Sequence, residues 1–213
     1  HDMYEAMTDP ELHRVYARGE TGMVTGLILG HFKKMKAEDF DKLKFDRVSW
    51  GIDFGYTNDK TCIVKMGVIG RKRFFKECCY LSGQEMEEQA QGRVSIAQFI
   101  KNILMQNGWD TSQTVWCDHD PEMILQLRKI RVPAKEAKKG KGSKVAGVSK
   151  LKEFECFYVG KNAEKEIISY KYVTVTDGVS GKEVVTNVPI DGNDHFCDAS
   201  RYVCYTDSFV HRV

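Results

Sequence analysis

Short runs of apolar or alternating residues give the first half of the chain the pattern of β-strands. Three short runs of this kind lie between turn residues, at 48–56, 61–70 and 72–82. Consecutive runs of this length predict three strands of an antiparallel meander. Ahead of them, residues 9–18 have the spacing of a helix, and residues 36–47 are expected to be a polar connection.

A period of three to four residues replaces the alternation after residue 84. Apolar side chains recur at this spacing within residues 85–107 and predict one helix that ends near Gly108. The chain then continues as strand 113–120, helix 121–130, strand 131–137, helix 144–154, strand 156–160, helix 162–173, hairpin 173–190 and a closing helix that begins near Asp194. This order predicts an α/β protein with a mixed central β-sheet flanked by helices.

Composition narrows the class of protein. Hydrophobic residues make up 42% of the 213 residues and charged residues 29%, which suits one sizeable globular domain. No apolar run approaches the roughly 18–20 residues that a membrane span needs, so we expect no membrane partner. The seven cysteines are scattered and form no C-x-x-C pair, which predicts reduced thiols rather than a disulfide framework or a zinc site.

Charge is distributed unevenly along the sequence. The net charge of +2 argues against a protein that is basic as a whole. Residues 131–150, however, hold seven basic side chains against the single acid Glu136. Such a stretch is either a solvated loop or a surface for a polyanion, and the sequence alone leaves both interpretations open.

Two aspartates stand at the ends of predicted strands. Asp53 interrupts an apolar strand pattern, where strand propensity disfavours it, and it is either a chemical group or a strand-end acid that faces solvent. Asp118 is continuous with the buried strand at 113–120. Asp120 precedes Pro121 and is a natural N-cap of the next helix, so it has a stronger structural explanation than Asp118 has.

The closing helix begins in a dense group of acids. Asp194 suits the N-cap, His195 is either a structural histidine or a group near a metal, and Asp198 lies one turn inside the helix, too deep for ordinary capping. Carboxylates are the hard oxygen ligands that Mg²⁺ and Mn²⁺ prefer, and two such ions can hydrolyse a phosphodiester. Aspartates from three elements beside a basic loop therefore point to a metal-dependent nuclease.

Four segments carry a family resemblance. "GIDFGYTND", "WCDHDPEMILQLRK", "AKEAKKGKGS" and "DGNDHFCDASRY" together resemble the C-terminal nuclease domain of the large terminase subunit of tailed bacteriophages. The resemblance covers roughly residues 14–205. It implies an RNase H-like fold, related to RuvC-type resolvases. Residues 1–47 would be the linker segment from a missing N-terminal ATPase domain, and residues 48–213 the nuclease domain.

The resemblance also implies roles for single residues. Asp53, Asp118 and Asp198 fall on the family's catalytic, metal-binding acids, which would hold two Mg²⁺ or Mn²⁺ ions. Asp120, His195 and Asp194 are further candidate ligands. The sequence "DHDPE" departs from the family, where many relatives read more like D-S-A-E-P, and the choice between the two aspartates stays open with Asp118 favoured. The basic side chains expected to contact DNA phosphates are Lys138, Lys139, Lys141 and Lys144.

The function implied is endonucleolytic cutting of concatemeric viral DNA during genome packaging, with little sequence specificity. No G-x-x-x-x-G-K-[ST] motif occurs, so ATP hydrolysis is not expected of this chain. Expected partners are double-stranded DNA and, in the full-length protein, the ATPase domain, the small terminase subunit and the portal. The expected location is the bacterial host cytoplasm and, transiently, the viral procapsid. Two alternatives remain: another RNase H-like nuclease of the Holliday-junction resolvase or transposase type, and a non-catalytic nucleic-acid-binding module.

Overall fold

A seven-stranded mixed β-sheet forms the centre of the molecule. In this computed structural model, residues 27–176, 178, 181–190 and 192–211 are described, and the helix expected at residues 9–18 lies outside them. The strands follow the order β1-β7-β4-β3-β2-β5-β6 across the sheet. Their bounds are β1 Lys33–Lys34, β2 Arg47–Asp53, β3 Lys60–Ile69, β4 Lys72–Ser82, β5 Val115–Cys117, β6 Ala134–Glu136 and β7 Glu155–Val159.

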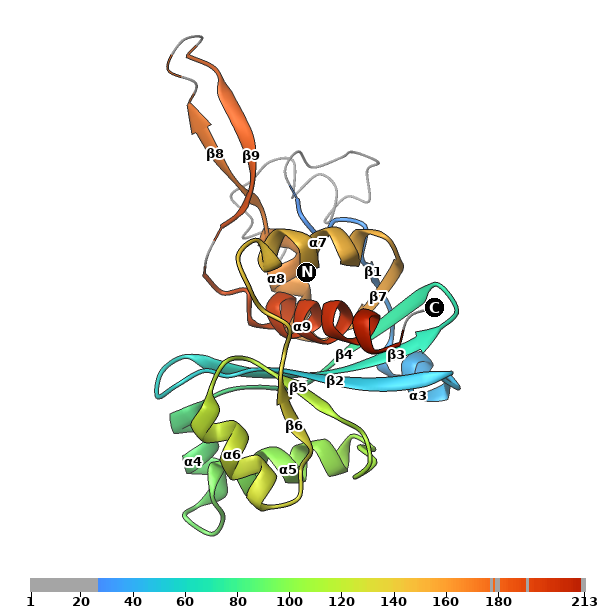
Figure 1. Cartoon of the computed structure of the whole chain (residues 1–213), viewed down its shortest axis with the longest axis vertical. Coiled ribbons are helices and arrows are strands. Elements are labelled where there is room, and N and C mark those ends of the chain that lie inside the picture. Colours follow the sequence, from blue (N-terminus) through green and yellow to red (C-terminus); the bar gives the residue numbers. More distant parts are fainter. Residues whose placement is uncertain (1–26, 177, 179–180, 191, 212–213) are drawn as a thin grey trace.

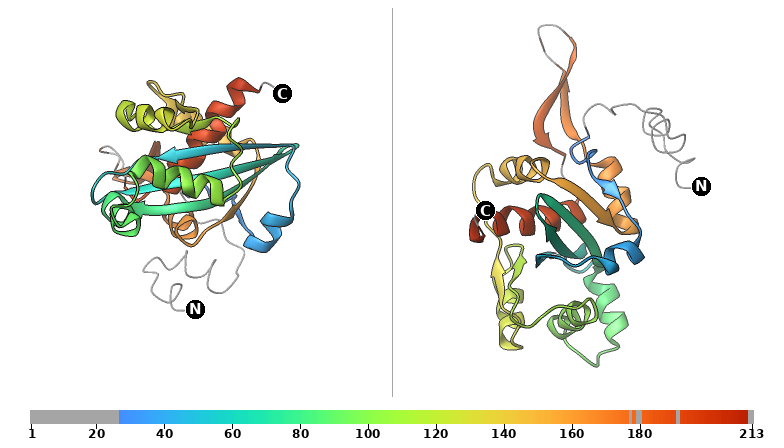
Figure 2. Two further views of the ribbon diagram at one scale, coloured as in Figure 1. Left: turned by 90° about the horizontal axis from the view of Figure 1, so that it is seen from below. Right: turned by 90° about the vertical axis from the view of Figure 1, so that its right-hand side faces the viewer.

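Helices cover both faces of this sheet, as Figure 1 shows. One face carries α4 (Gly83–Ala90), α5 (Ile96–Gln106) and α6 (Pro121–Lys129), and the other carries α7 (Ser143–Lys152), α8 (Lys161–Ser169) and α9 (His195–Val210). The short helix α3 spans Ala37–Lys42. A two-stranded hairpin of β8 (Tyr172–Thr176) and β9 (Glu183–Pro189) projects from the body (Figure 2). The expected α/β architecture is confirmed.

Two buried clusters form the core, one on each side of the sheet. The first joins β3 and β4 to α7, α8 and α9, with Phe75, Leu151 and Phe196 at most 1% exposed. The second joins β2 to α4, α5 and α6 around Trp50 and Leu104. Strand β3 pairs antiparallel with β2 on one side and with β4 on the other, which confirms the predicted meander. All seven cysteines lie in the described part of the chain and none forms a disulfide.

Helix α9 lies against the middle of the sheet because β2 contains a glycine at the point of contact. A Cβ atom on Gly51 would stand 2.4 Å from the carbonyl oxygen of Ala199 and 3.0 Å from the Val203 Cβ. Any larger residue would therefore push the helix away from the strand. Since Asp53 lies two residues beyond Gly51 and Asp198 precedes Ala199, this close approach also brings two of the predicted site acids together.

An internal ion pair fixes the other end of the same helix. Asp207, 2% exposed, accepts from Arg47 Nη2 and from Ser49 Oγ, each at 2.6 Å. Both donors belong to β2, so the strand holds the last turns of α9 as well as its centre. Partly buried pairs of this kind fix geometry more reliably than they add stability.

Two sequence predictions about local structure were wrong. Residues 85–107 form two helices rather than one, because Gln91 and Gly92 have positive φ and Ser95 caps the second helix. The segment 36–47 contains α3, whose single apolar residue beyond its first position, Phe40, is 1% exposed. A helix of six residues has too few apolar positions to show a period, so the pattern gave no signal for it.

Gly51→Ala is expected to lower the free energy of unfolding by about 1–3 kcal/mol, since the added methyl group overpacks the contact between β2 and α9. Chemical denaturation followed by circular dichroism measures this change. Gly140→Ala is the matched control, because a Cβ atom there has no neighbour within 4 Å. Equal unfolding free energies for the two variants would contradict the role of Gly51.

Candidate active site

Asp53 and Asp118 lie side by side at one edge of the sheet. Strands β2 and β5 are parallel neighbours, with Ile52 opposite Cys117, so Asp53 ends its strand and Asp118 directly follows the other. The backbone N–H of Asp118 donates to the carbonyl of Ile52 at 2.9 Å and continues the ladder by one residue. The carboxyl ends of parallel strands are where sites in α/β proteins gather.

Asp198 comes to this edge from α9. Its backbone N–H donates to the carbonyl of Asp194 at 2.7 Å, in the first turn of the helix. Its carboxylate accepts from Arg201 Nη2 at 2.8 Å and Nε at 3.2 Å, and from the Tyr202 hydroxyl at 3.2 Å. Gly147 of α7 lies directly over Arg201, where a Cβ atom would stand 2.5 Å from Cγ. The guanidinium is therefore held in place beneath α7.

A histidine links two acids at the centre of the site. His195 Nδ1 lies 3.0 Å from Asp53 Oδ2, and Nε2 lies 3.1 Å from an oxygen of Asp59, in the loop after β2. The bond to Asp53 raises the pKa of His195. Burial raises the pKa of Asp53 to about 6, the neighbouring charges of Asp198 and Asp194 add to the rise, and the bond from His195 opposes it.

A lysine ammonium group from the basic segment reaches the same acids. Lys139 Nζ donates to Asp118 Oδ1, which also accepts the backbone N–H of His119 at 2.6 Å. Burial and the charge of Arg201 lower the pKa of Lys139, whereas Asp198 and Asp53 act in the opposite direction. The three predicted acids therefore share one electrostatic environment with this ammonium.

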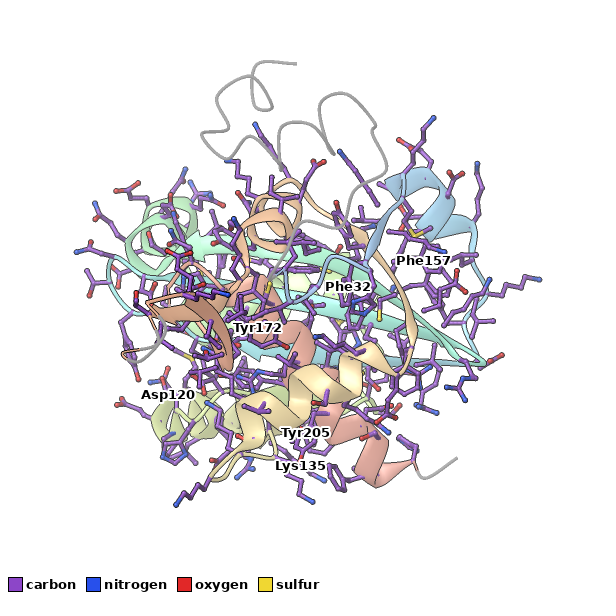
Figure 3. The ribbon with its side chains drawn as sticks, turned by 90° about the horizontal axis from the view of Figure 1, so that it is seen from above. Phe32, Asp120, Lys135, Phe157, Tyr172 and Tyr205 are labelled. Carbon is purple, nitrogen blue, oxygen red and sulfur yellow. The ribbon has the colours of Figure 1, made fainter. Side chains whose placement is uncertain are left out.

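Asp118 and Asp120 have different partners in the structure. Asp120 Oδ1 accepts the backbone N–H of Met123 at 2.9 Å, which confirms Asp120 as the N-cap of α6. It also lines a cavity of about 390 Å³ between the β2–β3 loop and α4, α5 and α6. Neither Asp118 nor Asp53 lines that cavity. Figure 3 labels Asp120 at the start of α6.

The prediction that the Asp194 side chain caps α9 was wrong. Asp194 stands at the N-cap position of α9, but its carboxylate makes no capping bond and instead accepts from Lys144 Nζ at 3.0 Å. Glu166 of α8 takes the capping role from outside the helix: its Oε2 accepts the backbone N–H groups of Phe196 and Cys197 at 2.8 and 3.0 Å.

Glu166 is a buried acid at the start of α9 that was not found from the sequence. It is 3% exposed, and its Oε1 accepts the Tyr80 hydroxyl at 2.8 Å. Burial raises its pKa to about 7. The signal in the sequence was an acid on the apolar stripe of α8, between the buried Ala163 and Ile167. Arg201 and Tyr202, which donate to Asp198, were also missed. They lie three and four residues after Asp198, the spacing at which side chains of one helix meet.

The donor set suits a hard divalent cation. Asp53, Asp118 and Asp198 offer carboxylate oxygens only, the ligand chemistry of Mg²⁺ and Mn²⁺. Positive groups of the chain itself, the Lys139 ammonium and the Arg201 guanidinium, contact two of these acids. Within the described residues, no three His, Cys, Asp or Glu side chains stand close enough together to hold one ion as they are placed. The ligand roles of the three aspartates, Asp120, Asp194 and His195 stay predictions.

The seven-stranded mixed sheet with helices on both faces is an RNase H-like fold. The g2p (large terminase) nuclease domain of bacteriophage SPP1, a structure with bound Mn, superposes with a TM-score of 0.64 at 20% identity, over 84% of this chain and 98% of that one. The large terminase nuclease of the thermophilic phage G20c gives 0.52 at 14% identity, over 84% and 97%. The chain thus has the fold of large terminase nuclease domains.

A longer protein shares this fold over part of its length. The large terminase of another thermophilic bacteriophage superposes with a TM-score of 0.60 at 16% identity, over 98% of this chain. This chain spans 51% of that protein. No protein-family model and no curated protein matches the sequence. In the described part of the chain, no helix has the length and apolarity that crossing a membrane requires.

Glu166→Gln is expected to remove a pH dependence of stability. The pKa of Glu166 rises from 4.5 to about 7 in the folded state, so folded protein keeps a proton that unfolded protein has lost between these values. This contribution to stability is fully present below pH 4.5 and is lost as the pH rises through 7. We expect the wild-type unfolding free energy to fall relative to the glutamine variant by on the order of 3 kcal/mol over this interval.

Urea denaturation of both proteins from about pH 4 to about pH 8, which brackets the two pKa values, measures this difference. Glu164→Gln on the same helix is a useful control, because its carboxylate pairs with Lys34 rather than with the backbone of α9. Parallel pH profiles for wild type and Glu166→Gln would contradict the raised pKa of Glu166 in the folded protein.

Proposed function

We propose that this chain is a metal-dependent DNA endonuclease that cuts concatemeric viral DNA during genome packaging. One observation carries the proposal: Asp53 at the end of β2, Asp118 directly after β5 and Asp198 of α9 all interact with Lys139 of the basic segment at the carboxyl edge of the sheet. The bound Mn in the SPP1 nuclease domain supports the choice of a divalent ion. Helix capping explains none of the three acids, whereas it fully explains Asp120.

Asp53, Asp118 and Asp198 would hold two Mg²⁺ or Mn²⁺ ions. Two such ions, when bound, activate water for in-line attack on the phosphodiester and stabilise the leaving 3′-oxygen. The chain's own task is to fix the acids: Gly51 sets the distance between β2 and α9, and the Arg201 pair orients the Asp198 carboxylate. A residue that bonds to a metal ligand, without touching the metal itself, commonly orients that ligand.

His195 would hold the Asp53 carboxylate in one orientation. Its two ring nitrogens are divided between Asp53 and Asp59, so the imidazole ties the end of β2 to the loop that follows. The Tyr80 ring packs edge-on against the imidazole, with the centroids 5.8 Å apart. With a side chain that is 12% exposed, His195 is well placed to position an acid and poorly placed to bind DNA.

The DNA would be bound through its backbone. Contacts from lysines to phosphates carry no sequence information, which fits cutting with little sequence specificity. In the full-length protein, we propose the ATPase domain, the small terminase subunit and the portal as partners. The proposed location is the bacterial host cytoplasm and, transiently, the viral procapsid. The proposed phosphate contacts are Lys138, Lys139, Lys141 and Lys144.

Replacing a ligand acid by its amide is expected to abolish Mn²⁺-dependent plasmid cleavage. Asp53→Asn and Asp198→Asn each remove one negative ligand and keep the shape of the side chain. A loss of roughly 100-fold or more is expected, since each 1.4 kcal/mol or so of lost transition-state stabilisation is about tenfold in rate. Melting temperatures of both variants provide the folding control. Undiminished cleavage by either folded variant would contradict the assignment of that aspartate as a metal ligand.

The neighbouring aspartates Asp118 and Asp120 give a matched pair of variants. Asp118→Asn should lose cleavage to the same extent, because its carboxylate belongs to the acid site. Asp120→Asn should cleave within about twofold of wild type, because asparagine caps a helix as well as aspartate does. Initial rates of supercoiled plasmid nicking at saturating Mn²⁺ decide between them. The opposite order of activities would assign the ligand role to Asp120.

A further inference from the structure

The basic segment between β6 and α7 crosses α9 and contacts it (Figure 1). The backbone N–H of Lys138 donates to Thr206 Oγ1 at 2.9 Å. The ammonium of Lys139 then lies 4.5 Å from the centroid of the Tyr202 ring, one turn nearer to the start of the helix. The segment therefore follows α9 from its C-terminal half back toward the acid site.

Lys139 is the residue of this segment that enters the site. Its ammonium donates to Asp118 Oδ1, and the charges of Asp53 and Asp198 act on the same group. Its side chain is 31% exposed and that of Asp118 is 25% exposed, so water screens the pair only in part. A positive charge of the chain thus stands among the acids to which the proposed function assigns divalent ions.

We propose that Lys139 is a tethered competitor of the metal, which neutralises Asp118 until a divalent cation takes this carboxylate, and which then contacts a DNA phosphate. The inference rests on the proposed function. An ammonium and a divalent cation on one carboxylate repel each other at short range, so that binding of one favours departure of the other.

The local chain allows the ammonium to move between two partners. Lysine carries a point charge on a flexible four-carbon stem, and it accepts a carboxylate or a phosphate as its partner without a fixed geometry. Gly140 and Gly142 follow in the loop, and neither position has a neighbour within 4 Å of an added Cβ atom. The segment therefore has room to shift while the bond from Lys138 to Thr206 keeps it on α9.

This arrangement couples two binding events. Metal binding frees a positive charge for the DNA, and DNA that takes the ammonium removes a competitor of the metal. Because linkage is reciprocal, each ligand raises the affinity for the other by the same factor. The competitor also leaves the acids partly neutralised in protein that carries no metal, which reduces their mutual repulsion.

Mn²⁺ affinity measured by isothermal titration calorimetry tests the first half of the proposal. Lys139→Met removes the charge and nearly keeps the length of the side chain, and Lys139→Gln is a second variant that keeps a neutral donor. Both are expected to bind Mn²⁺ on the order of tenfold more tightly than wild type, within the range of typical coupling between sites. Lys135→Met is the matched control, which removes the charge of an exposed lysine on β6 in the same basic segment and should leave the Kd within about twofold.

The salt dependence of DNA binding tests the second half. Affinity for a short duplex is measured between about 50 and about 200 mM KCl, a range over which phosphate contacts change the affinity strongly, without metal and with saturating Ca²⁺. Ca²⁺ should steepen the slope of log K against log salt for wild type. For Lys139→Met the steepening should be smaller, by an amount that corresponds to about one phosphate contact. Lys135→Met should show the same Ca²⁺-dependent steepening as wild type.

The outcomes separate this inference from the proposed function. Equal Mn²⁺ affinities for wild type, both Lys139 variants and Lys135→Met would overturn the role of Lys139 and leave the nuclease proposal standing. An absence of Mn²⁺ binding by all of these folded proteins would overturn both. Tighter Mn²⁺ binding by the Lys139 variants, together with the smaller Ca²⁺ effect on the salt slope, supports the inference.

Discussion

The close contact between α9 and β2 is the constraint that positions the rest of the site. Gly51 permits it, because the carbonyl oxygen of Ala199 occupies the space that a side chain would fill. The contact places Asp198 of the helix beside Asp53 of the strand. Buried groups then fix the helix at both ends, through Glu166 at its start and Asp207 near its end. Backbone packing and buried polar bonds thus jointly set the positions of the acids.

Bringing several acids together carries an electrostatic cost that the chain offsets with its own cations. His195 bonds to Asp53 in a nearly buried pair, Arg201 is enclosed beneath α7, and Lys139 arrives from the basic segment. Removing one partner from such a pair is more costly than its net contribution to stability, since the remaining charge stays partly buried. The same geometry concentrates negative charge around Asp53, on which the charges of Asp198 and Asp194 act.

Sequence reasoning predicted the parts of the fold that have a clear period or a local signal. The meander of β2, β3 and β4 shows as three short apolar or alternating runs between turn residues, and the cap at Asp120 has a proline directly after it. The break between α4 and α5 was missed because apolar residues such as Met86 and Ile96 continue on both sides of it, although Gly92 and Ser95 mark the turn. Contacts between distant parts of the chain explain the rest. Local rules assigned Asp194 the cap that Glu166 supplies from 30 residues away.

A crystal structure of the wild-type chain grown with Mn²⁺ would show which side chains hold the metal, because anomalous scattering locates the ion independently of the surrounding residues. We expect anomalous peaks at the carboxylates of Asp53, Asp118 and Asp198, with the Lys139 ammonium moved away from Asp118. Ordered carboxylates without an anomalous peak at saturating Mn²⁺, or a peak beside Asp120 alone, would contradict the assignment of these three acids.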